Sequence, residues 1–74
     1  MENQAKEAYT AVIKQQGELW FGWIEEVPGV DCQEPSREEL VLALQVSLRE
    51  AIEFYRSDAI DSAGDDYEEL LIAV

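Results

Sequence analysis

Apolar residues alternate near the start of the chain in a way that predicts two β-strands joined by a tight turn. The first strand is predicted over 8–15, and Gln16-Gly17 is the expected two-residue turn because glycine readily takes a positive φ. The second strand is centred on 20–24 (WFGWI), where both alternating sets of positions are apolar. A strand with one solvated face carries one apolar and one polar set, so we expect this strand to have neighbours on both faces.

The turn also sets the register of the predicted hairpin and therefore its two faces. On one face the expected pairs are Tyr9–Ile24, Ala11–Gly22 and Ile13–Trp20, and on the other they are Thr10–Trp23, Val12–Phe21 and Lys14–Leu19. Because Ala11 and Gly22 are small, a helix can approach the first face closely, and we assign that face to the core. Nothing else in the chain is obviously available to cover the second face. We therefore predict a partner or oligomer interface there, formed by Leu19, Phe21, Trp23 and Val12.

A helix start follows a short third strand predicted over 30–33. Ser36 is an N-cap candidate, and Glu39, three residues later, completes a capping box by reaching back to the N-cap amide. The main helix is predicted over 36–56, with a longer alternative that ends at residue 63 before Gly64. One apolar stripe at helical spacing is formed by Leu40, Leu44, Ser47, Leu48, Ala51 and Tyr55.

The remaining segments complete a single predicted domain over residues 1–74. Residues 1–7 are a polar N-terminal tail, 57–67 an acidic linker and 68–74 a last strand, while 8–33 hold the hairpin and the third strand. The predicted fold class is therefore α+β, with the element order β-β-β-α-β. We expect a small three- or four-stranded sheet with one long helix packed on one face, and a right-handed crossover that returns the last strand to the sheet.

The charge balance limits the partners that this chain can have. Five basic against 17 acidic residues give a net charge of −12, which repels nucleic acids and anionic membranes. Such a surface attracts basic proteins, and the simpler alternative is that the charge only keeps the protein soluble. No apolar run approaches the roughly 20 residues that span a bilayer, and the N-terminus does not look like a signal peptide, so a cytoplasmic protein is expected. With 74 residues the core is small, so a homodimer or higher oligomer is expected.

Little in the sequence indicates catalysis, and we expect a binding protein with no enzyme activity, cofactor or metal. The chain has no histidine, and the single cysteine, Cys32, has no catalytic partner, so it is interpreted as a half-buried small residue. Glu25, Glu26 and Asp31 lie near the end of the second strand. Because Glu25 and Glu26 point to opposite faces, a solvated sheet end is favoured over a metal site.

A second group of carboxylates is formed by Asp58, Asp61, Asp65 and Asp66. Their spacing fails the pattern of a calcium-binding loop, which needs ligands at alternating positions together with glycine at the sixth position and glutamate at the twelfth. The simpler interpretation is a solvated acidic linker. The functional alternative is acidic docking, in which these residues form a strip that binds the basic surface of a partner.

The order of these segments resembles the HicB-like antitoxin family. The resemblance covers about residues 8–56 and rests on Tyr9–Ile13, Trp20–Ile24 leading into Pro28–Val30, Gln33–Leu40 and Glu50–Glu53. It implies a partial ribonuclease-H-like sheet with one helix across it. It also implies a function, which is to bind a small basic RNA-cleaving toxin of the HicA type and occlude its active site. Many members of the family carry a further segment that binds the operon's own DNA.

This chain departs from the family pattern at several positions. It ends at Val74, which leaves no room for a DNA-binding domain, so the resemblance leaves operon autoregulation undecided. Glu34 stands where the family commonly has Gly, and Leu40 where it commonly has Ala. Trp23 occupies a position that is often polar, which strengthens the interface prediction. The alternative hypothesis is an orphan homo-oligomeric protein-interaction module that has no toxin partner and associates through its free sheet face or its helix surface.

Overall fold

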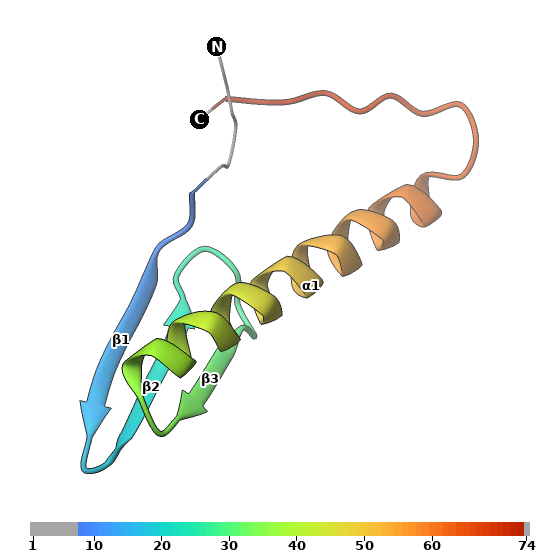
Figure 1. Cartoon of the computed structure of the whole chain (residues 1–74). Coiled ribbons are helices and arrows are strands. Elements are labelled where there is room, and N and C mark those ends of the chain that lie inside the picture. Colours follow the sequence, from blue (N-terminus) through green and yellow to red (C-terminus); the bar gives the residue numbers. More distant parts are fainter. Residues whose placement is uncertain (1–7, 74) are drawn as a thin grey trace.

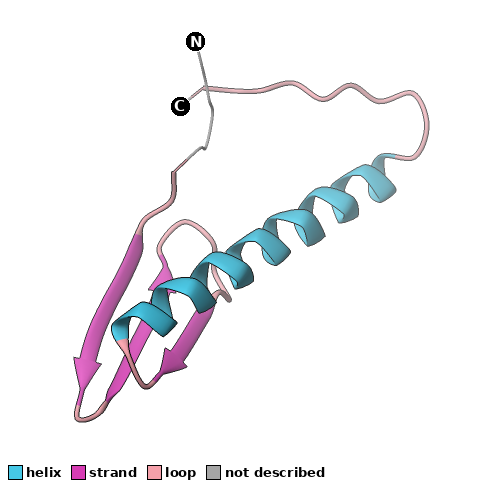
Figure 2. Cartoon of the chain, in the orientation of Figure 1, coloured by secondary structure: helices cyan, strands magenta, loops and turns pink. Residues whose placement is uncertain are grey.

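The computed structural model describes residues 8–73, which form one antiparallel sheet with one long helix across one of its faces (Figure 1). The strands are β1 (Ala11–Gln16), β2 (Leu19–Ile24) and β3 (Asp31–Glu34), in the spatial order β1-β2-β3, and the helix is α1 (Arg37–Ala63). The sheet lies beside the N-terminal half of α1 alone (Figure 2). The α+β class and the single covering helix are thus confirmed. The predicted tail at 1–7 lies outside the described residues.

The β1–β2 hairpin forms in a register that differs by two residues from the predicted one. Gln16 pairs with Leu19 and Ala11 with Ile24, so the turn is Gly17-Glu18 rather than Gln16-Gly17. Of the two turn residues, Gly17 has a positive φ of +64° and Glu18 does not. A positive φ at the first central residue alone is the pattern of a type II′ turn. Because side chains alternate with a period of two, this shift leaves every side chain on its predicted face.

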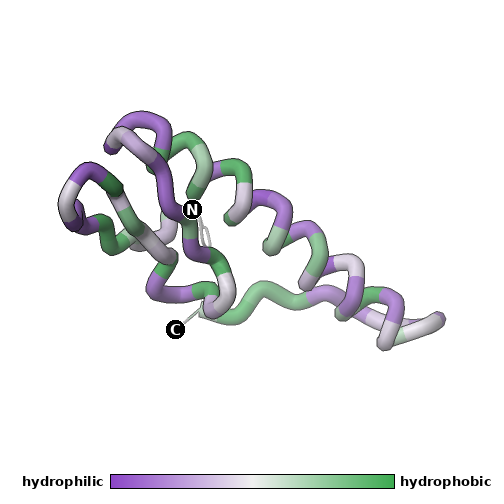
Figure 3. The backbone as a smooth tube through the Cα atoms, turned by 90° about the horizontal axis from the view of Figure 1, so that it is seen from below, coloured by the Kyte–Doolittle hydropathy of each residue, from purple (hydrophilic) through white to green (hydrophobic). Residues whose placement is uncertain are grey.

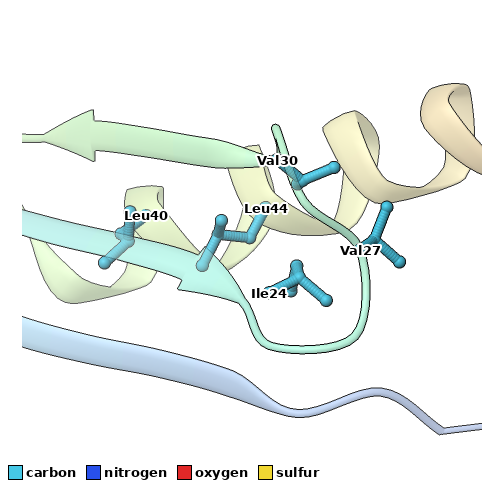
Figure 4. Close-up of a cluster of buried hydrophobic side chains, with 5 residues drawn as sticks. All are labelled: Ile24, Val27, Val30, Leu40 and Leu44. Carbon is cyan, nitrogen blue, oxygen red and sulfur yellow. The ribbon is translucent and has the colours of Figure 1, made fainter.

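A small core lies between α1 and the inner face of the sheet, the face that carries Trp20, Gly22 and Ile24. Among the described residues its buried side chains are Ile24, Val27, Val30, Leu40 and Leu44 (Figure 4). Half-buried apolar residues around them are Tyr9, Ile13, Trp20, Cys32, Leu48 and Ala51. The predicted assignment of this face to the core is therefore confirmed.

Gly22 marks the closest approach of the sheet to the helix. A Cβ atom at this position would lie 2.9 Å from Cδ1 of Leu44 and 3.0 Å from Cγ2 of Ile13. Packed interiors do not tolerate contacts this short, so the absence of a side chain is what lets α1 sit where it does. The sequence correctly indicated the close approach, although Ile13 rather than Ala11 is the cross-strand partner of Gly22.

Local hydrogen bonds define both ends of α1. The Glu39 amide donates to Oγ of Ser36 at 3.1 Å, and the Ser36 hydroxyl donates to Oε1 of Glu39 at 3.1 Å. The capping box therefore forms with one difference from the prediction: the carboxylate accepts from the hydroxyl and not from the N-cap amide. At the other end Gly64 has a φ of +74° and its N–H donates to the Ile60 carbonyl at 3.2 Å. The longer predicted end is the one observed, so 57–63 are helical and not part of a linker.

The C-terminal half of α1 projects beyond the sheet. A 27-residue helix is about 40 Å long, whereas the six-residue strands span about 20 Å. Ala51 is the last residue of α1 that packs against the core. The helix then continues for about 18 Å before the chain turns back (Figure 1). We call this part of α1, residues 52–63, the overhang.

The last strand predicted over 68–74 is not formed in its described part, 68–73. These residues have no regular secondary structure, and the sheet that the structure describes has three strands. Leu70, Leu71 and Ile72 are 72%, 82% and 76% exposed. The overhang carries the chain away from the sheet, so none of the three described strands lies beside this apolar segment to pair with it. The observed element order within the described residues is β-β-β-α.

Candidate protein interface

The outer face of the sheet, opposite α1, brings together the four apolar residues predicted as an interface. Val12 on β1 pairs directly with Trp23 on β2, and Leu19 and Phe21 lie on the same side of β2 because side chains alternate. Trp23 is 41% exposed and Leu19 is 37% exposed, while Val12 and Phe21 are half-buried. Since α1 packs on the inner face, it leaves this row uncovered. We call these four residues the apolar strip.

Polar side chains frame the apolar strip. Lys14 on β1 and Gln33 on β3 both pair with Phe21, and Asp31 on β3 pairs with Trp23. All three polar residues are exposed. An apolar centre inside a polar, solvated rim is the common anatomy of a protein interface. Gln33 and Asp31 were not predicted to lie on this surface, although the alternation of side chains along β3 would have placed them there.

The four acidic residues predicted to dock a partner do not lie on the outer face. Asp58 and Asp61 belong to the last turns of α1, and Asp65 and Asp66 follow the helix end at Gly64. All four are exposed. They give the overhang an acidic end that is separated from the apolar strip by the length of the overhang. The two candidate surfaces are therefore distinct.

Just after β2, the carboxylate of Glu26 and the backbone of Glu25 both bond to the backbone of Thr10. Oε1 of Glu26 accepts the N–H of Thr10 at 2.8 Å, and the Glu25 amide donates to the Thr10 carbonyl at 2.9 Å. These bonds join the segment before β1 to the turn after β2. Within residues 8–73, no group of three or more His, Cys, Asp or Glu side chains is placed to hold a metal ion.

Cys32 faces the core and is half-buried, as the sequence predicted. Its Sγ atom lies 3.5 Å from Oγ of Ser47, which is a hydrogen bond between a strand and the helix. Cys32 therefore helps to hold β3 against α1.

A second group of exposed apolar side chains lies on α1. Leu42, Val46, Phe54 and Tyr55 are between 50% and 65% exposed, and the rings of Phe54 and Tyr55 meet edge to face at 5.7 Å. Tyr55 was predicted in the core stripe, but it lies beyond Ala51, where the sheet has ended and leaves nothing to cover it. Scattered apolar residues on a helix surface are ordinary, so this group is the weaker candidate for an interface.

No helix in the part of the chain that the structure describes is both long enough and apolar enough to cross a membrane. Comparison with known protein families, with curated proteins and with solved structures finds no match to this chain. A function is therefore proposed from the surfaces of the chain itself and from the order of its sequence motifs.

Proposed function

We propose that this protein is a HicB-like antitoxin, or a relative of one, that binds a small basic RNA-cleaving toxin of the HicA type and occludes its active site. The observation that carries the proposal is the apolar strip, which α1 leaves uncovered on the outer face. Three antiparallel strands followed by a helix across one face also agree with the partial ribonuclease-H-like fold that the sequence resemblance implies. The apolar strip is the observation that favours binding, because a fold alone does not define a function.

Trp23 is the residue on which we expect the binding energy to concentrate. It lies on the central strand between Val12 on β1 and Asp31 on β3, and a tryptophan in the centre of an interface is commonly an energetic hot spot. Leu19 and Phe21 extend the contact along β2. Lys14 and Asp31 at the rim fix the orientation of the partner rather than the strength of binding.

The charge of the chain supports a basic partner. A toxin that cleaves RNA has a positive surface to hold the phosphate backbone, and a protein of net charge −12 is attracted to that surface. The exposed carboxylates of Asp58, Asp61, Asp65 and Asp66 extend this field past the sheet, where they compete with RNA for the basic groups of the toxin. A cytoplasmic location, where such a toxin meets its RNA, belongs to the same proposal.

The experiment compares Trp23→Ser with Phe54→Ser, because both changes replace an exposed aromatic side chain with serine. The candidate toxin is a small basic protein sought in the reading frames next to this one. It is mixed with this protein, and both the dissociation constant and the residual RNA cleavage are measured. We expect Trp23→Ser to raise the dissociation constant by about 30-fold or more, which corresponds to a loss of about 2 kcal/mol. Phe54→Ser, on α1, is expected to stay within about twofold of wild type.

Two results would contradict the proposal. Equal losses in the two variants would show that the apolar strip is not the contact surface. A candidate toxin that stays toxic when the wild-type protein is co-expressed would remove the antitoxin function itself.

A second candidate function, an orphan homo-oligomeric module, is favoured by one observation. Apolar side chains are exposed on α1 and after Gly64 as well as on the outer face. Recovery of the tagged protein with itself alone would support this candidate over the antitoxin.

A further inference from the structure

The apolar segment Leu70–Ala73 is the most exposed apolar stretch that the structure describes. We call it the tail, as distinct from the predicted N-terminal tail at 1–7. Its three large side chains are between 72% and 82% exposed. It follows α1 as a chain without regular secondary structure, runs apart from the sheet (Figure 1) and is coloured as a hydrophobic stretch in Figure 3. Consecutive apolar residues in an extended segment are the composition of a strand that is buried on both faces. Among residues 8–73 the tail therefore has no partner strand.

Two sheet edges can accept such a strand. The order β1-β2-β3 leaves the outer edges of β1 and β3 unpaired within the described residues, and a free edge presents backbone N–H and C=O groups to any strand that arrives. β1 has six residues and β3 has four. The longer edge can form the longer ladder.

Charge favours β1 over β3. The strand β1 contains Lys14 and no acid, whereas β3 contains Asp31 and Glu34. The segment that leads into the tail carries four acids and no base: Asp65, Asp66, Glu68 and Glu69. Like charges on neighbouring strands are destabilising and opposite charges are favourable, so this segment is repelled at β3 and attracted at β1.

The start of the tail is held on the overhang, away from the sheet of its own chain. Oε1 of Glu69 lies 3.6 Å from Nη2 of Arg56. Tyr67, Glu68 and Glu69 line a shallow hollow together with residues of the last turns of α1. The tail therefore begins, at Leu70, near the position of Arg56 along the helix axis. That position is about 7.5 Å past Ala51.

From this position the tail does not reach the edge of its own β1 with enough residues to pair. The path from Leu70 to the edge of β1 has three components. It runs back about 7.5 Å along the helix axis and about 10 Å from the helix layer to the sheet layer. It also runs about 7 Å across the strands, because α1 packs over β2 and β3. The direct distance is about 14 Å, which takes at least four extended residues. The path would therefore use all four residues of the tail, 70–73, and leave none of them for the ladder.

We propose that the tail pairs as an additional strand with the β1 edge of a second copy of this chain. Each copy has one tail and one β1 edge, so a mutual exchange closes into a dimer with two-fold symmetry. In the added strand Leu70 and Ile72 share one face while Leu71 and Ala73 share the other. The side chains on one face of the added strand extend the apolar strip next to Val12. Those on the other face lie beside Ile13 at the border of the core. Because both faces then contact apolar residues, both pairs of side chains in the tail are expected to be apolar. The proposal does not rest on the antitoxin function.

The test uses the full chain alone and measures its mass in solution by sedimentation over a range of concentrations. Leu71→Pro and Ile72→Pro are compared with Leu71→Ala and Ile72→Ala. Alternate N–H groups point to opposite sides of a strand, so one of the two prolines must remove an N–H that faces β1. We expect a wild-type dimer, and we expect at least one proline variant to raise its dissociation constant by about tenfold or more over the matched alanine variant. Because both residues are more than 70% exposed, the circular dichroism of α1 should not change.

Amide hydrogen exchange identifies the edge. We expect the amides of β1 to be protected in the wild-type dimer and to lose that protection in the weakened proline variant, with those of β3 unchanged. A wild-type chain that is monomeric at all concentrations would overturn the proposal. So would proline variants that dimerise as well as their alanine counterparts, or protection that appears on β3 in place of β1.

Discussion

At the scale of single residues, Gly22 couples the sheet to the helix more tightly than any other described glycine. It lies on the central strand, and the methyl groups of Leu44, Leu40 and Ile13 fill the space where its side chain would be. The other three glycines have open space around them and instead have positive φ. Gly22 is thus required for packing, whereas Gly17 is required for a turn.

Gly22→Ala is expected to lower the free energy of unfolding by about 1–3 kcal/mol, because the new methyl group would meet Cδ1 of Leu44 at 2.9 Å. Urea denaturation measures the loss. In the matched double variant Leu44→Val removes that methyl group from the contact, so the alanine should then be less destabilising than it is alone. Strictly additive losses would contradict the proposed overlap.

At the scale of elements, α1 has two halves with different sources of stability. The first half is capped by Ser36 and buries Leu40 and Leu44 against the sheet. The overhang has no core behind it, and its last turn contains no basic residue that would complement the helix dipole. The overhang is therefore expected to rely on intrinsic helix propensity and on the Gly64 cap.

Ser36→Ala is expected to lower the free energy of unfolding by about 1 kcal/mol, because the Glu39 amide loses its acceptor. Ser57→Ala is the matched control: it makes the same chemical change at an exposed position inside the helix, where alanine is expected to be neutral or slightly stabilising. Thermal denaturation followed by circular dichroism compares the two variants. Similar melting temperatures for both would show that the cap contributes little.

The elements that the sequence predicted well are those fixed by nearby residues. The start of α1 follows from Ser36 and Glu39 and its end from Gly64, all of which act within a turn or two of the chain. The hairpin register was wrong by two residues because Gly17 can occupy either central position of a two-residue turn, and the dipeptide does not say which. The faces were still correct, since a shift of two preserves the alternation.

The last strand was wrong for a different reason. An apolar run such as 70–73 has the composition of a strand, but a strand forms only beside another strand, and the sequence does not say how far a preceding helix carries it from the sheet. The interface residues Leu19, Phe21 and Trp23 were placed correctly because alternation alone assigns them to one face. Whether a partner binds there stays a prediction.

At the scale of the whole molecule, a small core stabilises the fold while a large negative net charge opposes it. The buried apolar side chains of the described residues number five, while the chain carries a net charge of −12. Charge of one sign destabilises a compact state through self-repulsion. Stability should therefore depend on ionic strength more than it does in a domain of balanced charge.

Adding sodium chloride, from about 0.02 M to about 0.5 M, is expected to raise the urea midpoint of unfolding, because it shortens the screening length from roughly 20 Å to about 4 Å. The matched variant Asp58→Asn/Asp61→Asn reduces the repulsion and should show a smaller rise. A midpoint that is unchanged or falls with salt would indicate that self-repulsion does not limit the stability of this fold.

The overhang also fixes the direction in which the chain leaves the domain. Each residue of a helix adds about 1.5 Å of length and about 100° of rotation. An insertion or deletion of a single residue in 52–63 would therefore barely alter how far the chain reaches, yet it would turn the exit at Gly64 by more than a quarter of a circle. The number of residues in α1 therefore determines the direction in which the chain continues after Gly64, whichever side chains the overhang carries.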